Sequence, residues 1–282
     1  MLPAVQPVDR ELVELWLSLK TSVHTRRAYA FEAGRFLAAV GKPLNATTLA
    51  DVQGWLSGVE RAGLKPATLN RAVTAMKSLF SFALDTGYLP FNVTVAVKLR
   101  PRRDDLAQRI LDEDAVARII DAAGQGRDRV LLKVLYLSGA RVSEICGLRW
   151  RDTAARQGGG QVTLFGKGGK TRTVLLREKA WEEVIALRGA ALEDEAVFAS
   201  RKGRGQLDPS HVRRIVYAAA RRAGIPQQVS PHWMRHAHAS HALDRHAPIH
   251  LVQATLGHSS VATTGRYLHA RPSESSSFYL PE

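Results

Sequence analysis

The stretch SPHWMRHAHASHALDRHAPIHLVQATLGHSSVATTGRY, residues 230–267, gathers histidines, arginines and a tyrosine within a few helical turns. Ser230 followed by a proline predicts a helix that begins with an N-cap and proline at its first position. His232 and Arg235 then lie three residues apart on one face of that helix. Both side chains can therefore contact one phosphate together.

The second half of this stretch predicts a helix end and a presented histidine. Gly257 follows an apolar-periodic run and is typical of a residue that ends a helix. His258 is then expected just beyond the helix terminus, where side chains often face a ligand. Tyr267 follows a short turn rich in Ser and Thr.

The histidines also allow a structural or a metal-binding interpretation. His232, His236, His238 and His241 include i,i+4 spacings that could hold zinc or lie on an ordinary helix face. Zinc is disfavoured, because a third firm ligand is missing, Cys146 is distant in an apolar context and no HExxH glutamate is present. We therefore expect no metal site and no cofactor.

Composition and charge point to a nucleic-acid partner. The 282 residues suffice for one large or two moderate domains, and 45% hydrophobic residues support folded cores. The 40 Lys and Arg residues exceed the 26 Asp and Glu residues, which gives a formal charge of +14 and favours a polyanion. No run is long and apolar enough to span a membrane, and no signal peptide opens the chain. The single cysteine excludes an intramolecular disulfide and fits a reducing interior, so we expect the cytoplasm.

The first hundred residues predict a bundle of four amphipathic helices. Asp9 and Thr25 are the expected caps of the first two helices, and the third and fourth are expected to start near Thr48 and Pro66. The first apolar stripe is expected to contain Leu12, Leu15, Trp16 and Leu19. Basic side chains of this bundle could contact DNA, although a solvated surface explains any one of them equally well; the candidates are Arg26, Arg27, Lys65, Arg71 and Lys77.

Dense charge and Pro101 mark a boundary after the bundle. The sequence predicts a domain at residues 1–98, a linker at 99–108, a second domain at 109–272 and a tail at 273–282. The linker is either a hinge between two basic modules or a plain surface connection. The tail is Ser-rich and ends in the short apolar tip Phe278-Tyr279-Leu280.

The second domain begins with helices. Val130–Leu137 is strongly apolar, Gly139 interrupts it, and an apolar face resumes after Arg141. Arg141 is therefore expected at a helix start, where its guanidinium and nearby backbone donors can bind an anion. Glu144, one turn further on, can hold this arginine in place.

A period of two residues then predicts a β-hairpin. Residues 161–165 and 171–176 read as strands around the glycine-rich loop GKGGK, which places Lys167 at its tip. The loop lacks the order of a P-loop and the helix that follows one, so we do not interpret it as a nucleotide-binding P-loop. Helices are expected at about 178–188 and 210–222. Further DNA-binding candidates of this domain are Lys170, Arg172, Arg213 and Arg214.

These residue types suit cleavage of a phosphodiester. Two arginines, Arg141 and Arg235, can stabilise the charge on the non-bridging oxygens, and a lysine such as Lys167 can protonate the leaving oxygen. A tyrosine nucleophile forms a covalent phosphotyrosine that keeps the bond energy for religation, without ATP or metal. Because an unperturbed tyrosine ionises near pH ~10, the flanking cations and histidines are expected to help remove the proton of Tyr267.

The motifs SGARVSEICGLRW, FGKGGKTR, HWMRH and LGH, with the tyrosine that follows, resemble the tyrosine recombinase (phage integrase) family. The resemblance covers both domains and includes the pattern Ser22, Thr25 and Tyr29 of a core-binding domain. It implies a mainly α fold with a small antiparallel β-hairpin, formed by a helical, SAM-like core-binding bundle and an α+β catalytic domain. It also implies the active-site set Arg141, Lys167, His232, Arg235, His258 and Tyr267, with Tyr267 as the nucleophile.

The resemblance further implies a clamp around duplex DNA, a 3'-phosphotyrosyl intermediate and strand exchange through a Holliday junction. The expected partners are double-stranded DNA with paired sites, a homotetramer or a heterotetramer with a second recombinase, and an activator protein. The apolar tip of the tail would then dock in a neighbouring protomer. Departures from the family pattern, Gly265, Leu268 and His246, leave the six positions intact.

Several functions share this chemistry. The chain resembles compact Xer-type recombinases, which favours resolution of chromosome or plasmid dimers. Integration or transposition of a mobile element or small phage is the alternative. A type IB topoisomerase and a non-catalytic DNA-binding relative are disfavoured, the first by the modular layout and the second because all six groups are present.

Overall fold

The computed structural model describes residues 7–64, 66–101, 104–201, 203 and 205–270, and the chain divides into two compact units, Met1–Arg103 and Asp104–Glu282. The division falls inside the stretch 99–108. Within that stretch, the last residues already belong to the second unit, because Leu106 is buried in it together with Ile110. The predicted tail lies outside the described residues. No described helix has the length and apolar character needed to cross a membrane.

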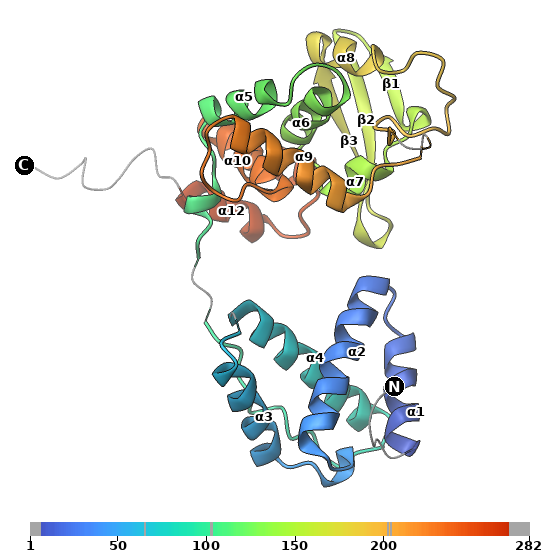
Figure 1. Ribbon diagram of the computed structural model, residues 1–282, viewed down its shortest axis with the longest axis vertical. Helices are drawn as coiled ribbons and strands as arrows, with labels where there is room; N and C mark the ends of the chain where they lie inside the picture. Colours follow the sequence, from blue (N-terminus) through green and yellow to red (C-terminus); the bar gives the residue numbers. More distant parts are fainter. Residues whose placement is uncertain (1–6, 65, 102–103, 202, 204, 271–282) are drawn as a thin grey trace, which may run out of the picture. The chain divides into compact units, whose positions relative to one another are not determined.

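Unit 1 is a helical bundle (Figure 1). Its elements are α1 (Pro7–Ser18), α2 (Val23–Val40), the 3₁₀ turn η1 (Leu44–Ala46), α3 (Leu49–Arg61) and α4 (Pro66–Asp85). Helix α3 starts near Thr48, as predicted, and Thr48 caps it in a reciprocal capping box with Asp51. The predicted apolar face of α4 is buried. Edge-to-face contacts of Phe36 with Trp55 and Phe80 lie in the core of the bundle.

Two predictions about the first helices are wrong. Asp9 is not a cap but lies inside α1, buried, where it accepts hydrogen bonds from the Leu44 amide (3.1 Å) and the Tyr88 hydroxyl (2.7 Å). This carboxylate ties α1 to two distant segments, which local periodicity cannot reveal. The predicted apolar stripe is also too wide, since Leu15 and Leu19 are exposed while Leu12 and Trp16 are buried.

The cap of the second helix differs by one turn from the prediction. Ser22, rather than Thr25, is the N-cap of α2, and its hydroxyl accepts a hydrogen bond from the Thr25 amide. The Ser-x-x-Thr pattern places either hydroxyl near a helix start. The extended backbone of Ser22 (φ −89°, ψ 123°) makes it the cap.

Unit 2 packs helices against a small sheet, whose other face and edge strand β1 are largely exposed. In chain order its elements are η2 (Ala107–Arg109), α5 (Glu113–Ala122), α6 (Arg127–Ser138), α7 (Val142–Gly147), η3 (Trp150–Asp152), β1 (Thr153–Arg156), β2 (Gly159–Phe165), η4 (Lys167–Gly169), β3 (Thr171–Arg177), α8 (Glu178–Ile185), α9 (Pro209–Arg222), α10 (Pro231–Asp244), α11 (Ile249–Leu256) and α12 (Val261–Ala270). The mainly α fold with a small antiparallel sheet is confirmed.

The sheet is antiparallel with the order β1-β2-β3. The predicted hairpin forms β2 and β3, but β1 was missed, because its four residues are mostly exposed and carry no apolar alternation. Along β3 the residues Arg172, Val174 and Leu176 alternate with exposed neighbours and share the inward face of the pleat. Arg172 pairs with Leu164 across the strands, so its side chain starts from the buried face.

Helix α6 connects the sheet to the helices that carry the functional stretch. It contacts β3 on one side and α10 on the other, and α8 packs against β2 (Figure 1). The main core of unit 2 is formed around α6 by residues such as Leu131, Leu135 and Ile145. A second cluster joins α10, α11 and α12, and it includes Tyr267.

Candidate active site

The junction of α6 and α7 presents Arg141. Gly139 ends α6 in the left-handed conformation (φ 56°), and an added Cβ there would come within 2.9 Å of both Leu256 and His238. Arg141 is the N-cap of α7, as predicted, and its side chain is 35% exposed. Only Nη1 of its guanidinium is hydrogen-bonded within the described residues, so the other two nitrogens remain open to a ligand.

Glu144 holds Arg141 in place, as predicted. Its carboxylate accepts hydrogen bonds from the Arg141 amide (2.7 Å) and from Arg141 Nη1 (2.8 Å). Burial by itself raises the pKa of Glu144, but hydrogen bonds from Arg172 and Arg141 outweigh burial and hold the pKa below its usual value. The carboxylate is therefore ionised at neutral pH.

Helix α10 begins as the sequence predicts, with Ser230 as N-cap and Pro231 in the first turn. Arg235 is buried, and its guanidinium donates to the carbonyl oxygens of Gly139 (2.5 Å) and Leu256 (2.6 Å). Burial, followed by the nearby charge of Arg141, lowers the pKa of Arg235 to about 10. Arg235 thus joins the ends of α6 and α11, a role that its spacing from His232 did not predict.

A cleft of about 840 Å³ lies between the hairpin loop and the end of α11. Its lining includes Arg141, Gly166, Lys170, Arg172 and His258. Three of these residues are cationic, so the cleft is suited to an anion. The predicted arginine and the predicted histidine beyond Gly257 therefore face one common space.

His258 follows the helix end at Gly257, which has the expected left-handed backbone (φ 64°). Its Nδ1 is 2.9 Å from the Thr264 hydroxyl. Burial, followed by the charges of Arg235 and Arg141, lowers the pKa of His258 to about 4. His258 is therefore neutral at pH 7 and can act through a hydrogen bond rather than as a cation.

The hairpin loop lies against the same cluster. The Gly166 amide donates to the Lys170 carbonyl (2.7 Å), and a Cβ on Gly166 would lie 3.2 Å from Glu144 Oε1. The backbone of Lys167 lies in the turn η4 between two cleft-lining glycines. The side chain of Lys167 falls outside the described residues, so its predicted role stays a prediction.

Tyr267 lies in α12 and is only 5% exposed. Its hydroxyl is hydrogen-bonded to Nδ1 of His236 (2.8 Å), and its ring is parallel to that of His258 with centroids 6.4 Å apart. Burial raises the pKa of Tyr267 more than Arg235 and Arg266 lower it. The phenol is therefore neutral in this conformation, and the help that the surrounding groups are expected to give in removing its proton stays a prediction.

His232 lies near the same groups without a hydrogen bond to the described residues. Its ring centroid is 6.3 Å from that of His236, and burial with the charges of Arg235 and Arg141 lowers its pKa. His232 is therefore also neutral at pH 7. An arrangement of neutral histidines beside buried arginines favours hydrogen bonding to a phosphate over additional positive charge.

The remaining histidines of α10 serve the fold. His241 bonds the Tyr136 hydroxyl and the Leu111 carbonyl, both at 2.9 Å. His238 packs edge-on against Tyr136, and burial lowers its pKa to about 4. Among the described residues, no three His, Cys, Asp or Glu side chains are grouped to hold a metal ion.

Two residues of the site were missed as such. His236 was considered only as a disfavoured zinc ligand or as part of an ordinary helix face, and Arg172 only as a DNA contact. The inward face of β3 is the signal that could have identified Arg172, because an arginine at a buried strand position needs an internal partner. No local signal links His236 to Tyr267, which is 31 residues away.

The predicted DNA contacts fall into three groups. Arg26, Arg27, Lys170, Arg213 and Arg214 are exposed, and Lys65 lies outside the described residues. Arg71 pairs with the buried Glu32 (2.9 Å), and Lys77 donates to three backbone carbonyls, the shortest bond being to Val97 (2.8 Å). Arg172 is committed to internal partners. Lys77 and Arg172 thus have internal hydrogen-bond partners, and the DNA-binding role of all these residues stays a prediction.

A tyrosine beside paired arginines and neutral histidines is the arrangement of an enzyme that cleaves phosphodiesters through a phosphotyrosine. Comparison with known proteins agrees: the model of the "Phage integrase family" matches residues 109–274, and the "Phage integrase, N-terminal SAM-like domain" matches residues 11–87. The chain belongs to the phage integrase family and is a tyrosine recombinase, an enzyme that cleaves and religates DNA.

Named relatives place it near the Xer group. It is 34% identical over 274 residues to tyrosine recombinase XerC of Mycobacterium bovis (strain BCG / Pasteur 1173P2), with 90% of this chain and 91% of the relative covered. It is 32% identical over 282 residues to tyrosine recombinase XerC of Xanthomonas campestris pv. campestris (strain B100), with 95% and 84% covered.

Solved structures share the fold. XerA recombinase is 26% identical, covers 97% of this chain and 99% of its own, and has a TM-score of 0.55. A lambda integrase(75-356) dimer bound to a COC' core site is 20% identical, covers 95% and 96%, and has a TM-score of 0.77. The second likeness is one of fold alone.

Proposed function

We propose that this tyrosine recombinase uses Tyr267 to attack a DNA phosphate held in the cleft beside Arg141 and His258. The observation that carries the proposal is the parallel packing of Tyr267 on His258, which itself lines the cationic cleft. The Tyr267 oxygen bonds to phosphorus, and the bond to the 5' oxygen breaks. The products are a 3'-phosphotyrosyl ester and a free 5'-hydroxyl, and religation reverses these steps.

The proposed roles follow from the charges of the groups. Arg141 and Arg235 stabilise the negative charge that develops on the non-bridging oxygens, while neutral His232 and His258 add hydrogen bonds. Lys167 protonates the leaving 5' oxygen. Because the phenol is buried and neutral in the structure, Tyr267 must first leave its position beside His236 and give its proton to solvent or to a neutral histidine such as His232 or His258.

For the biological role we propose Xer-like resolution of chromosome or plasmid dimers in the cytoplasm. The named XerC relatives support this role at 32–34% identity. Two paired DNA sites, a tetramer and a Holliday junction would then be required; a lambda integrase tetramer bound to a Holliday junction has a similar fold. The tetramer consists of one chain type or includes a second recombinase, and an activator protein sets the order of strand exchange.

Integration or transposition of a mobile element is the second candidate, because a Tn1549 transposon integrase in complex with circular intermediate DNA shares the fold with a TM-score of 0.69. A type IB topoisomerase would relax supercoils without paired sites. A pure DNA binder would not respond to loss of Tyr267. The DNA target therefore distinguishes the biological roles, while the covalent step distinguishes the enzyme from a binder.

The test uses nicked suicide duplexes, which trap the covalent intermediate. Wild-type protein and Tyr267→Phe are incubated with duplexes from the replication-terminus region and from nearby mobile elements, and adducts are separated on denaturing gels. We expect an adduct with wild-type protein only and equal DNA binding by both proteins. Tight binding without any adduct from the wild type would contradict the proposed chemistry.

A further inference from the structure

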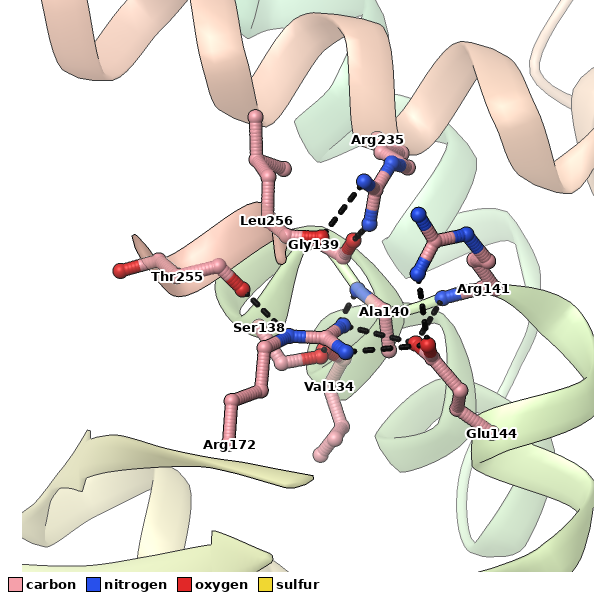
Figure 2. A network of polar contacts seen from close by, with 10 residues as sticks. All are labelled: Val134, Ser138, Gly139, Ala140, Arg141, Glu144, Arg172, Arg235, Thr255 and Leu256. Atoms are coloured by element: carbon pink, nitrogen blue, oxygen red, sulfur yellow. Dashed lines mark hydrogen bonds and ion pairs between the residues drawn. The ribbon is translucent and has the colours of Figure 1, made fainter. Parts of the chain in front are cut away.

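Three segments of the site meet at the guanidinium of Arg172. Figure 2 shows this group between Glu144, which precedes it by 28 residues, and the carbonyl of Thr255, which follows it by 83. The first partner belongs to the segment that presents Arg141. The second belongs to the end of α11, just before His258. Arg172 itself lies on β3, the strand that follows the loop of Lys167.

All three nitrogens of this guanidinium donate hydrogen bonds. Nη1 and Nη2 bind the two Glu144 oxygens at 2.9 and 2.7 Å, and Nε binds the Thr255 carbonyl at 2.6 Å. The Arg172 side chain is 10% exposed and that of Glu144 is 1% exposed. Bidentate arginine-carboxylate pairs of this kind fix the direction of both groups, and in a buried setting they are little screened.

Glu144 therefore binds two arginines at once, and the competition between them matters for Arg141. Each oxygen of the carboxylate accepts from both partners: Oε1 from Arg141 Nη1 and Arg172 Nη1, and Oε2 from the Arg141 amide and Arg172 Nη2. While Arg172 satisfies much of the carboxylate, Arg141 is held by a single side-chain bond. Loss of Arg172 would draw the Arg141 guanidinium onto the carboxylate and away from the cleft.

The end of α11 is fixed by a pair of arginines. Arg172 binds the carbonyl of Thr255, and Arg235 binds the carbonyl of the next residue, Leu256. Carbonyls of a last helical turn lack intrahelical donors, and cations stabilise them. Gly257 permits this approach, since an added Cβ would lie 3.3 Å from Arg172 Cδ. The position of His258 thus depends on the same guanidinium.

We infer that Arg172 is a positioning residue that sets Arg141 and His258 relative to the hairpin strand that follows Lys167. This inference rests on the proposed function of these three residues. Arg172 acts through Glu144 and the Thr255 carbonyl, and it does not need to touch the DNA. Lysine cannot replace it, because an ammonium group lacks the planar fork that reaches two carboxylate oxygens and a carbonyl together.

The experiment compares single-turnover cleavage by wild type, Arg172→Ala, Arg172→Lys, Glu144→Gln and the double variant Arg172→Ala/Glu144→Gln. The substrate is a suicide duplex that the wild type cleaves, at saturating protein. Arg177→Ala is the matched control, because this arginine lies on the same strand with its side chain exposed. Thermal unfolding and DNA affinity are measured for every protein.

We expect Arg172→Ala and Arg172→Lys to cleave roughly 10- to 100-fold more slowly, since a misplaced group costs this much even when it lies outside the chemistry. DNA affinity should change less than threefold, and Arg177→Ala should cleave at the wild-type rate. The double variant should lose little more than either single variant, because both residues act through one network. Methylguanidinium should restore cleavage to Arg172→Ala, whereas equimolar urea or NaCl should not.

Results that contradict the inference can be distinguished from results that contradict the proposed function. Folded Arg172→Lys with wild-type cleavage would overturn the inference, as would fully additive losses without rescue by methylguanidinium. A wild-type protein that makes no adduct would instead contradict the proposed function. In that case the inference can still be tested without DNA, by measuring folding stability as a function of pH. Because Arg172 helps to lower the pKa of Glu144, Arg172→Lys should lose stability at a higher pH than the wild type does. The same acid dependence in both proteins would contradict the proposed network.

Discussion

The two sides of the active site are built in opposite ways. On the side that would bind the phosphate, charged groups are paired and fixed: Glu144 lies between Arg141 and Arg172, and Arg235 donates to two backbone carbonyls. On the side of the nucleophile, the groups are buried and neutral. Tyr267 is bonded to His236, whose pKa is lowered to about 4 by burial and by His232.

This difference indicates which part of the site must move. Fixed donors stabilise a developing charge best when they need no rearrangement during the reaction. A buried neutral phenol, in contrast, is a poor nucleophile, and Tyr267 does not line the cleft. We therefore expect DNA binding to leave the arginine side nearly unchanged and to displace the segment of α12 that carries Tyr267.

The largest effect on stability and cleavage is expected from a substitution of Arg235, which belongs to the fixed side of the site. Arg235→Met keeps the apolar stem but leaves the carbonyls of Gly139 and Leu256 without their donors, at about 1–3 kcal/mol each. Cleavage should also fall about 100- to 1,000-fold, as for loss of one oxyanion donor. Urea unfolding and adduct formation measure the two losses.

Arg266→Met is the control for stability. It removes an ion pair with Asp104 in which the side chains are 56% and 59% exposed, and exposed pairs of this kind contribute little to stability. If Arg235→Met were as stable as this control, the two carbonyl bonds would not support the fold.

Lowering the pH is expected to have an intermediate effect, namely a loss of folding stability. The pKa of His236, His238 and His258 is about 4 in the folded chain, chiefly because of burial. The unfolded chain binds these protons near pH 6.5, so stability is present above that pH and is lost as the pH falls toward 4. Each histidine contributes at most about 1.4 kcal/mol per pH unit to this slope.

Variants of His236 measure how much this histidine contributes to the loss of stability in acid. His236→Asn should flatten the slope by up to one proton while it keeps an acceptor for Tyr267, whereas His236→Leu leaves a buried hydroxyl unpaired at a cost of about 1–3 kcal/mol. Because Tyr267 must leave His236 before it attacks, cleavage by His236→Leu should fall less than tenfold. A loss as large as that of Arg235→Met would show that His236 takes part in the chemistry.

The smallest effect concerns the helix of the nucleophile. Gly265 lies inside α12, and an added Cβ would meet nothing within 4 Å. Gly265→Ala should stabilise the helix by about 0.5–1 kcal/mol and slow cleavage a few-fold, if α12 must deform to release Tyr267. Gly54→Ala in α3, with equally open space, is the control and should leave cleavage unchanged. Unchanged cleavage in Gly265→Ala would mean that α12 moves as a rigid helix.

Much of the fold was predictable because its signals are local. Ser230-Pro231 starts α10, Gly257 ends α11 and Thr48 caps α3, since caps depend on the backbone preferences of a few adjacent residues. The Arg141-Glu144 bond was also predictable, because three residues at a helix start bring the two side chains together.

Errors arose where a polar side chain has a distant partner. Asp9 resembles a helix cap in sequence, yet it binds Leu44 and Tyr88, which are 35 and 79 residues away. Leu15 and Leu19 continue an apolar pattern that none of the described helices covers. Periodicity defines a face of a helix, but it does not define how much of that face a neighbour buries.

The sequence by itself determined the family, the mainly helical fold and the residue types of the site, because motif spacing and backbone preference are properties of short segments. Only the tertiary structure decided that Arg235 binds Gly139 and Leu256 and that Tyr267 is buried against His236. It likewise showed that Arg172, a candidate DNA contact, is paired with Glu144. The physical reason is that a buried polar group bonds to whichever partner the packing brings within about 3 Å. That partner is often distant in the sequence, so local sequence patterns do not predict it.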